Sequence, residues 1–227
     1  MRFAFISDIH GNAIALKAVL NDIKRKNIDQ LFVLGDICYR GPEPKRSLDL
    51  VRALNVDVIK GNADEWVVRG VRKGEVPDDV HAKMNEERDW IVSKLNNESI
   101  NYLKNLPEDL HLECESYKIH AFHATPTSLF DVVHPDENDQ KLSGKLLVNE
   151  ADILIYGHIH KPYVRFVNGK CIINTGSVGL PFDGMNKSSY AIVEVEEGNI
   201  LTSIVRVDYE VDEVIKQIKE SDYPNKG

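Results

Sequence analysis

Short apolar runs recur along the chain at intervals that suit alternating strands and helices. Five of them are the clearest, and they span residues 3–7, 31–34, 56–60, 119–122 and 153–156. Such runs are typical of strands that are largely buried. Apolar residues on one helical face predict a helix after the first strand (Ala13, Leu16, Leu20 and Ile23) and after the second (Ser47, Leu50, Val51 and Leu54). The first half of the chain is therefore predicted to consist of repeated βα units.

Residues 65 to about 107 carry little strand pattern and many helix-forming residues, which predicts a helical insertion. Its expected buried positions are Trp90, Ile91, Leu95, Ile100 and Leu103. Two roles are open for it. It can pack against the sheet, or it can cover the site and restrict the size of the substrate.

The second half predicts a helix near residues 138–148 and a set of short strands. These strands span 163–167, 171–174, 190–195 and 201–207, with Asn168-Gly169 as a hairpin turn. A carboxyl-terminal helix would place Val211, Val214, Ile215 and Ile218 on one face. Two mixed sheets flanked by helices fit this order. No repeat or linker divides the chain, so we expect one domain over residues 1–227.

Polar side chains follow each of the five apolar runs. They form the clusters Asp8-Ile9-His10, Gly35-Asp36, Gly61-Asn62, His123 and Gly157-His158-Ile159-His160. Open α/β sheets bind their ligands at the carboxyl ends of the strands. We therefore expect these clusters to meet in one site.

The side-chain types indicate which metal and which chemistry the site supports. Three carboxylate or amide groups and four imidazoles, with no thiolate, suit Mn, Fe, Co, Ni or Zn. Seven side chains exceed the needs of one tetrahedral ion, but two ions that share a bridging carboxylate would use them all. Two ions about 3.5–4 Å apart can activate a water and stabilise in-line displacement at phosphorus. The sequence thus predicts phosphoester hydrolysis by a metal-bound hydroxide.

The order of these motifs, with Arg40-Gly41 after Asp36 and Asp64 after Asn62, resembles the calcineurin-like metallophosphoesterases over residues 1 to about 184. Among them the chain is similar to the short prokaryotic phosphoesterases. The resemblance implies an α/β fold, the four-layer αββα sandwich, and two divalent ions, with Mn preferred over Fe, Zn, Co and Ni. It implies that Asp36 bridges the ions. It assigns the first ion to Asp8, His10, Asp36 and His160, and the second to Asp36, Asn62, His123 and His158.

Two positions depart from the commonest family pattern. Tyr39 stands where many members have an Asp, and Ala63 stands where many have a His that assists as a general acid. The identity of the proton donor is therefore open. The predicted catalytic residues are Arg40, Asp36 and Asn62. Arg40 is also expected to bind the substrate phosphate, because a guanidinium can donate two parallel hydrogen bonds to phosphate oxygens. A surface ion pair is the alternative for Arg40.

The other candidate residues have alternative interpretations. His120 lies three residues from His123 and faces another direction in a strand, so we interpret His120 as structural. His134 follows the His123 strand in a loop and is predicted to contact substrate. Asp64 is expected to cap a helix that begins near Glu65. The glycine-rich segment 174–179 fits a loop of the family and a plain turn equally well. His81 and His111 are expected at the surface or at caps.

Composition narrows the partners and the compartment. A net charge of −8 argues against a broad nucleic-acid surface, which needs clustered Lys and Arg, but not against a phosphoester substrate. Three cysteines without close spacing favour a reducing cytoplasm over a disulfide framework. No apolar run approaches the length of a membrane span.

The alternative function is a catalytically weakened regulatory module that binds metal and a phosphorylated or nucleotide ligand.

Overall fold

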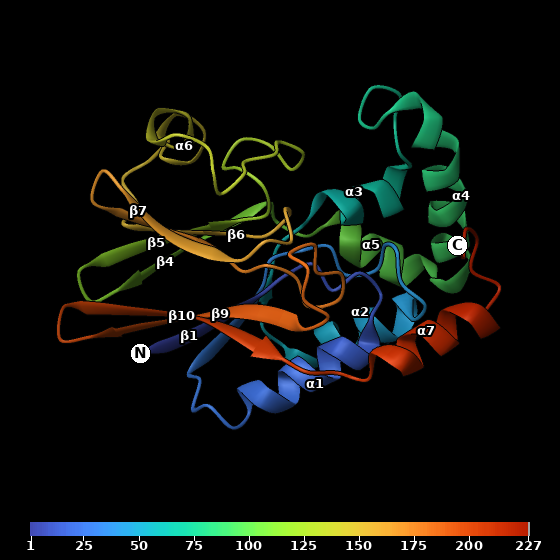
Figure 1. Cartoon of the computed structure of the whole chain (residues 1–227), viewed down its shortest axis with the longest axis horizontal. Helices are drawn as coiled ribbons and strands as arrows, with labels where there is room; N and C mark the ends of the chain where they lie inside the picture. The colour runs from blue at the N-terminus through green and yellow to red at the C-terminus, as the bar shows by residue number, and fades with distance from the viewer. Residues whose placement is uncertain (227) are drawn as a thin grey trace.

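Two five-stranded sheets stack face to face in the computed structural model of the protein, which describes residues 1–226 (Figure 1). The first contains β1 (Arg2–Ile6), β2 (Gln30–Val33), β3 (Asp57–Val58), β9 (Ser188–Glu196) and β10 (Asn199–Val207), in the order β10-β9-β1-β2-β3. The second contains β4 (Asp109–Cys114), β5 (Tyr117–Phe122), β6 (Ile153–Tyr156), β7 (Tyr163–Val167) and β8 (Lys170–Asn174), in the order β4-β5-β6-β8-β7. Both sheets contain parallel and antiparallel pairs. In the first, β1, β2 and β3 are parallel, whereas β9 is antiparallel to β1 and to β10. In the second, β5, β6 and β8 are parallel, whereas β4 is antiparallel to β5 and β7 is antiparallel to β8.

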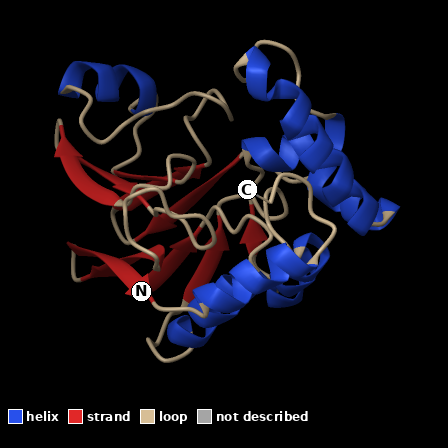
Figure 2. Ribbon diagram, turned by 45° about the vertical axis from the view of Figure 1, so that its right-hand side comes forward, coloured by secondary structure: helices blue, strands red, loops and turns tan. Residues whose placement is uncertain are grey.

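Helices cover the outer faces of the sheets (Figures 1 and 2). On the side of the first sheet lie α1 (Ala13–Ile23), α2 (Pro44–Leu54) and α7 (Val211–Glu220), whereas α6 (Asp139–Leu146) covers the second sheet. Beyond one end of the sheets lie α3 (Asn62–Arg69), α4 (Asp78–Lys94) and α5 (Asn97–Lys104). The layers run helix, sheet, sheet, helix, which confirms the expected αββα sandwich.

The two central strands have apolar residues on both faces because each face meets a core. In β1, Phe3 and Phe5 point into the core between the sheets, whereas Ala4 and Ile6 point to the helices. Residues of β6 alternate in the same way between the core between the sheets and the core under α6. A strand with two buried faces shows a continuous apolar run in the sequence, which is why these strands were predictable.

The predicted helical insertion is helical and packs as part of the core. Ile91 and Leu103 are fully buried and belong to the same core as Leu16 of α1 and Leu48 of α2. Trp90, Leu95 and Ile100 are only partly buried against it. The first helix of the insertion begins at Asn62 and not near Glu65.

One strand was missed and another is shorter than predicted. The strand β4 lies just after the predicted insertion, where Leu110, Leu112 and Cys114 alternate with polar residues. Both flanking residues of each apolar position are exposed or partly exposed, so this strand lacks a continuous apolar run. The strand β3 has two residues, whereas residues 56–60 were predicted. The hairpin at Asn168-Gly169 is confirmed, with φ values of 52° and 76° that suit a tight β-turn.

None of the helices within residues 1–226 is both long enough and apolar enough to span a membrane. Cys38, Cys114 and Cys171 are buried and unpaired.

Candidate metal centre

The folded chain brings all seven predicted ligands to one edge of the two sheets. They follow the carboxyl ends of β1, β2, β3, β5 and β6. Backbone hydrogen bonds tie the neighbouring loops together, from the amide of Asp8 to the carbonyl of Gly35 (3.1 Å) and from that of His10 to the carbonyl of Asp36 (2.9 Å). On the second sheet, the amide of Gly157 donates to the carbonyl of His123 (2.9 Å).

Most of the candidate ligands have a positive φ, which residues other than glycine rarely adopt. Five of the seven predicted ligands, Asp8, His10, Asp36, His158 and His160, have φ between 49° and 66°. Positive φ is uncommon outside glycine, and such residues concentrate at functional sites where the surrounding structure holds them. The loops are therefore shaped around these side chains.

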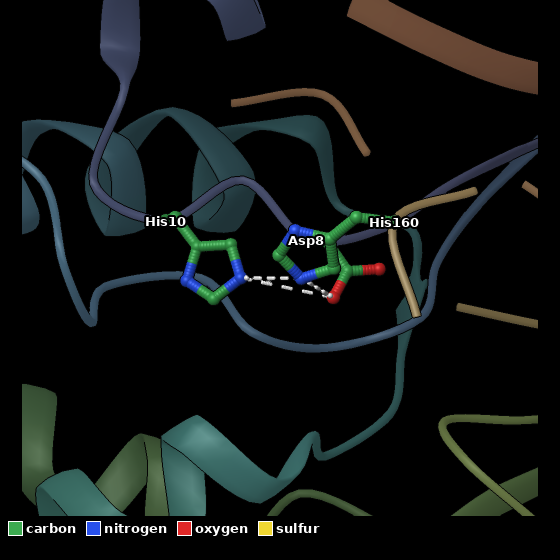
Figure 3. A group of neighbouring side chains, drawn as sticks. All are labelled: Asp8, His10 and His160. Carbon is green, nitrogen blue, oxygen red and sulfur yellow. Dashed lines mark hydrogen bonds and ion pairs between the residues drawn. The ribbon is translucent and has the colours of Figure 1, made fainter. Parts of the chain in front are cut away.

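One half of the site is formed by Asp8, His10 and His160 (Figure 3). The Nε2 atoms of His10 and His160 lie 3.1 Å apart. Asp8 Oδ1 lies 3.1 Å from His160 Nε2 and 3.7 Å from His10 Nε2. This oxygen is buried and accepts no hydrogen bond from the described residues. A buried, unpartnered carboxylate oxygen that faces two imidazole nitrogens fits a cation.

The other half is formed by Asn62, His123 and His158. Asn62 Oδ1 lies 2.9 Å from His123 Nε2 and 2.7 Å from His158 Nδ1. Asp36 joins the halves, because its Oδ2 is 3.4 Å from His123 Nε2 and 3.7 Å from His10 Nε2. The carboxylate of Asp36 therefore faces both halves of the site.

Hydrogen bonds set the orientation of the imidazoles. His10, His123 and His160 each donate Nδ1–H to a backbone carbonyl and so turn the Nε2 lone pair into the site. The accepting carbonyls belong to Tyr39 (2.7 Å), Leu34 (2.7 Å) and Leu180. Metal-binding histidines have such partners almost always, because the partner selects the tautomer. His158 differs and presents Nδ1 to the site.

Asp8 and Asp36 each have one carboxylate oxygen that accepts hydrogen bonds from the surrounding protein. Asp8 Oδ2 accepts from the Ser7 hydroxyl and from the amide of His158 (3.0 Å), and Asp36 Oδ1 accepts from the amide of Ala63 (2.8 Å). A Cβ at Gly61 would lie 2.0 Å from Asp36 Oδ1. Glycine at this position therefore lets the carboxylate approach the backbone.

The electrostatics of the site favour positive charge beside its carboxylates. Burial raises the pKa of Asp8, but the positive charge of His160 and the nearby imidazoles of His10 and His123 outweigh burial and hold the pKa well below its ordinary value. Burial lowers the pKa of His123, but the charge of Asp36 raises it to about 10. Burial and the charge of His123 lower the pKa of His158 to about 4. At neutral pH its imidazole is therefore uncharged and has a lone pair that a metal ion can bind. Divalent cations would supply the positive charge in place of imidazole protons.

Asp64 organises the backbone under the site. Its carboxylate accepts from the amides of Asp36 (2.7 Å), Ile37 (2.9 Å) and Gly61 (2.9 Å). It thus caps the start of α3, but from the third residue of a helix that begins at Asn62, whereas the sequence predicts a cap before a helix that begins near Glu65. It also fixes the loop that carries Asp36. Burial and the charge of Asp36 raise the pKa of Asp64 to about 7 against these hydrogen bonds. The contact with the amide of Asp36 joins residues 28 positions apart, so no local pattern indicates it.

A cavity of about 220 Å³ opens onto the candidate ligands. Arg40 lines it, and its Nε lies 3.4 Å from Glu87 Oε2, so the surface ion pair is present and the side chain also faces the cavity. His134 is exposed and is absent from the residues that line the cavity, so its contact with substrate stays a prediction.

The two departures from the family pattern also line this cavity. Ala63 contributes a methyl group, and the Tyr39 hydroxyl donates to the carbonyl of Met84 (2.9 Å). Burial raises the pKa of Tyr39 far above its usual range. Apart from the candidate ligands, Tyr39 and Arg40 are the only titratable residues among the described residues that line the cavity.

A separate group of Asp109, His111 and His120 lies on β4 and β5. His120 donates Nε2–H to Asp109 Oδ2 (2.9 Å), and Asn149 donates to its Nδ1 (2.7 Å). The rings of His111 and His120 stack at 4.1 Å and 11°, so one ion cannot lie in both ring planes. His120 therefore has a structural role, as interpreted from the sequence.

Known proteins share the sequence and the fold of this chain. The family model of the calcineurin-like phosphoesterase superfamily domain matches residues 1–198. An uncharacterized protein of Methanocaldococcus jannaschii is 33% identical over 97% of this chain and 93% of its own length. Serine/threonine-protein phosphatase 2 of Escherichia coli is 29% identical over 76% of this chain and 86% of its own length.

Solved structures share the fold of this chain. A metallophosphoesterase from Sphaerobacter thermophilus is 28% identical with a TM-score of 0.77, over 99% of this chain and 95% of its own. A hypothetical protein from Pyrococcus horikoshii is 24% identical with a TM-score of 0.84, at the same coverage, and supports the fold alone.

Proposed function

Because this chain belongs to the calcineurin-like phosphoesterase superfamily, we propose that it is a phosphoester hydrolase that uses two divalent metal ions. The position of Asp36 Oδ2, within 3.4 Å of His123 Nε2 and 3.7 Å of His10 Nε2, carries the proposal for two ions. The buried, unpartnered Asp8 Oδ1 supports it independently.

In this proposal the seven side chains divide between two positions that share Asp36. Asp8, His10, Asp36 and His160 hold the first ion, and Asp36, Asn62, His123 and His158 hold the second. When bound, the ions would activate water and neutralise charge on the phosphoryl oxygens. The protein fixes the orientation of Asp36 through the hydrogen bond from the amide of Ala63. Asn62 Oδ1 faces His123 and His158, which belong to the same ion position.

Arg40 is the proposed contact to the substrate phosphoryl group. Its Nε faces Glu87, and neither terminal nitrogen has a hydrogen bond to the described residues. The guanidinium is half-exposed at the cavity, so a phosphoryl oxygen can reach it. A guanidinium that donates to an oxyanion stabilises the charge that builds there during displacement.

The second candidate is a regulatory module that binds a phosphorylated or nucleotide ligand with little turnover. The methyl group of Ala63 and the engaged hydroxyl of Tyr39 favour it, because neither can donate a proton to a leaving group. The complete set of candidate ligands opposes it.

Hydrolysis of p-nitrophenyl phosphate and bis(p-nitrophenyl) phosphate tests the proposal. We expect turnover of at least one ester with added Mn and its loss after treatment with EDTA. The faster ester distinguishes phosphatase activity, which the name of the E. coli relative suggests, from phosphodiesterase activity. Saturable binding of both esters, with turnover no faster than without metal, would support the regulatory module.

We propose Mn for both positions and the cytoplasm as the compartment. The carboxylate, amide and imidazole donors also accommodate Fe, Zn, Co and Ni, so metal analysis of protein purified without added metal is the deciding measurement. The cytoplasm suits three buried, unpaired cysteines. The helical insertion belongs in the same domain as the sheets, because both contribute to one core.

A further inference from the structure

The cavity at the metal centre has a polar floor and apolar walls. We propose that these walls bind the organic group of the substrate, and that this group is flat, apolar and about the size of one aromatic ring. The inference rests on the proposed phosphoester chemistry, because the candidate ligands and Arg40 would hold the phosphoryl group beside it.

The walls come from two segments that are far apart in the sequence. The first, in and between α3 and α4, contributes Trp66, Val76, Pro77, Val80 and Met84. The second, between β8 and β9, contributes Leu180 and Phe182. Phe182 stacks on His160 (centroids 4.4 Å apart, 17° between planes), yet 54% of it is exposed. A large ring left open to solvent beside a candidate metal ligand marks a surface that a ligand can cover.

The polar atoms of the aromatic walls already have partners. Trp66 Nε1–H donates to Glu75 Oε2 (3.0 Å), and the Tyr39 hydroxyl donates to the carbonyl of Met84 (2.9 Å). These residues therefore offer carbon surface to a ligand. The hydroxyls of a sugar or the edge of a nucleobase would be buried there without hydrogen bonds, which is costly. An apolar group has no such cost.

The volume limits the size of the group. The cavity measures about 220 Å³, whereas an apolar cavity of about 150 Å³ in a protein is enough for benzene. One ring and a phosphoryl group thus fill the available space. Ala63 also lines the cavity and contributes to its shape, because its methyl group takes little room.

Phosphonates test this pocket without hydrolysis, because their P–C bond is stable to phosphoesterases. We would measure by calorimetry the binding of phenylphosphonate, methylphosphonate and 2-hydroxyethylphosphonate to the Mn-loaded protein. Full burial of an aromatic side chain corresponds to roughly 10- to 100-fold in affinity. Phenylphosphonate should therefore bind about 10- to 100-fold more tightly than methylphosphonate, and the hydroxyethyl compound should not gain.

Val80→Trp fills the pocket and should remove the preference for phenylphosphonate while methylphosphonate binds as before. Ala82→Trp is the matched control, because Ala82 is exposed on the same helix and outside the cavity. Val80→Thr, which keeps the shape and adds a hydroxyl, should reduce the preference in part. Methylphosphonate binding and Mn content report whether each variant is folded.

The pocket is rejected if the parent binds both compounds equally or binds neither, or if Val80→Trp keeps the preference. Turnover of p-nitrophenyl esters is measured separately. A phenyl preference without turnover supports the pocket and rejects hydrolysis, whereas turnover without a phenyl preference rejects the pocket and supports hydrolysis.

Discussion

At the scale of single residues, Asp36 has a different task for each carboxylate oxygen. Oδ1 accepts from the amide of Ala63, whereas Oδ2 lies between the imidazoles of His10 and His123. The backbone thus orients a group that would otherwise rotate. Loss of the charge should affect both metal positions at once.

Asp36→Asn should weaken binding of both ions and remove nearly all activity. The loss of affinity should exceed the roughly 10- to 100-fold that follows loss of an outer partner of a metal ligand. Calorimetric titration with Mn measures it. Asp57→Asn makes the same chemical change at an exposed residue of β3 and should leave binding unchanged. Two equivalents bound with unchanged affinity by Asp36→Asn would contradict the bridging role.

Arg40→Ala should reduce kcat/KM while metal content stays the same. A hydrogen bond to a charged group is worth about 1.5–3 kcal/mol, which corresponds to roughly a 10- to 100-fold loss. Arg46→Ala is the matched control, because Arg46 makes an exposed ion pair with Glu43 outside the cavity. Equal kcat/KM in Arg40→Ala and the parent would restrict Arg40 to its pair with Glu87.

Ala63 leads to a prediction about leaving groups. A positioned general acid contributes about 10²- to 10⁴-fold, mostly for leaving groups that tolerate charge poorly. The parent should hydrolyse aryl esters far better than alkyl esters, and Ala63→His should accelerate the alkyl esters. A series of esters graded by leaving-group pKa, with chemistry rate-limiting, measures the slope. A flat series in the parent would reveal another proton donor.

At the scale of elements, two contacts attach α4 to the loop that carries the candidate ligand Asp36. Tyr39 donates to the carbonyl of Met84 (2.9 Å), and Arg40 pairs with Glu87 (3.4 Å). Arg88 in turn donates to the carbonyls of Val67 (3.1 Å) and Val68 (3.2 Å) at the end of α3. The walls of the cavity are therefore fixed relative to its floor.

Tyr39→Phe should lower the free energy of unfolding by about 1–3 kcal/mol, because it leaves the buried carbonyl of Met84 without its donor. Denaturant unfolding measures the change. Tyr117→Phe is the matched control, since its hydroxyl donates to the carbonyl of Gly198 at an exposed position and water can replace it. That variant should stay within about 0.5 kcal/mol of the parent. Equal losses would mean that burial of the Tyr39 contact is unimportant.

At the scale of the whole molecule, the candidate metal centre joins the two sheets. Asp8, Asp36 and Asn62 follow strands of the first sheet, whereas His123 and His158 follow strands of the second. Ions held between the sheets would connect parts of the chain that are about 150 residues apart, such as His10 and His160. Metal binding should therefore stabilise the complete fold.

Mn at about 100 times its Kd should raise the free energy of unfolding by about 2.7 kcal/mol for each ion that binds only the folded state. Unfolding with Mn and with EDTA measures the difference. Asp57→Asn should keep the effect, and Asp36→Asn should lose most of it. A parent protein that is equally stable in both conditions would argue against metal binding to the folded state.

The sequence by itself determined most of the strands and the order of the candidate ligands along the chain. Runs such as 153–156 belong to strands buried on both faces, so their apolar character is continuous and visible. Asp8, Asp36 and His158 follow such runs, and parallel strands bring their carboxyl ends to one edge. That topology explains why the sequence alone groups seven candidate ligands that are scattered over about 150 residues, although their roles stay predictions.

Only the tertiary structure decided what surrounds those side chains. The strand β4, which is buried on one face only, has no continuous apolar run. No local pattern shows that Asp64 holds the loop of Asp36 or that Tyr39 reaches Met84. The apolar cavity combines residues 66–84 with residues 180 and 182. Such contacts depend on how distant segments pack, whereas periodicity along the chain records only the burial of each segment.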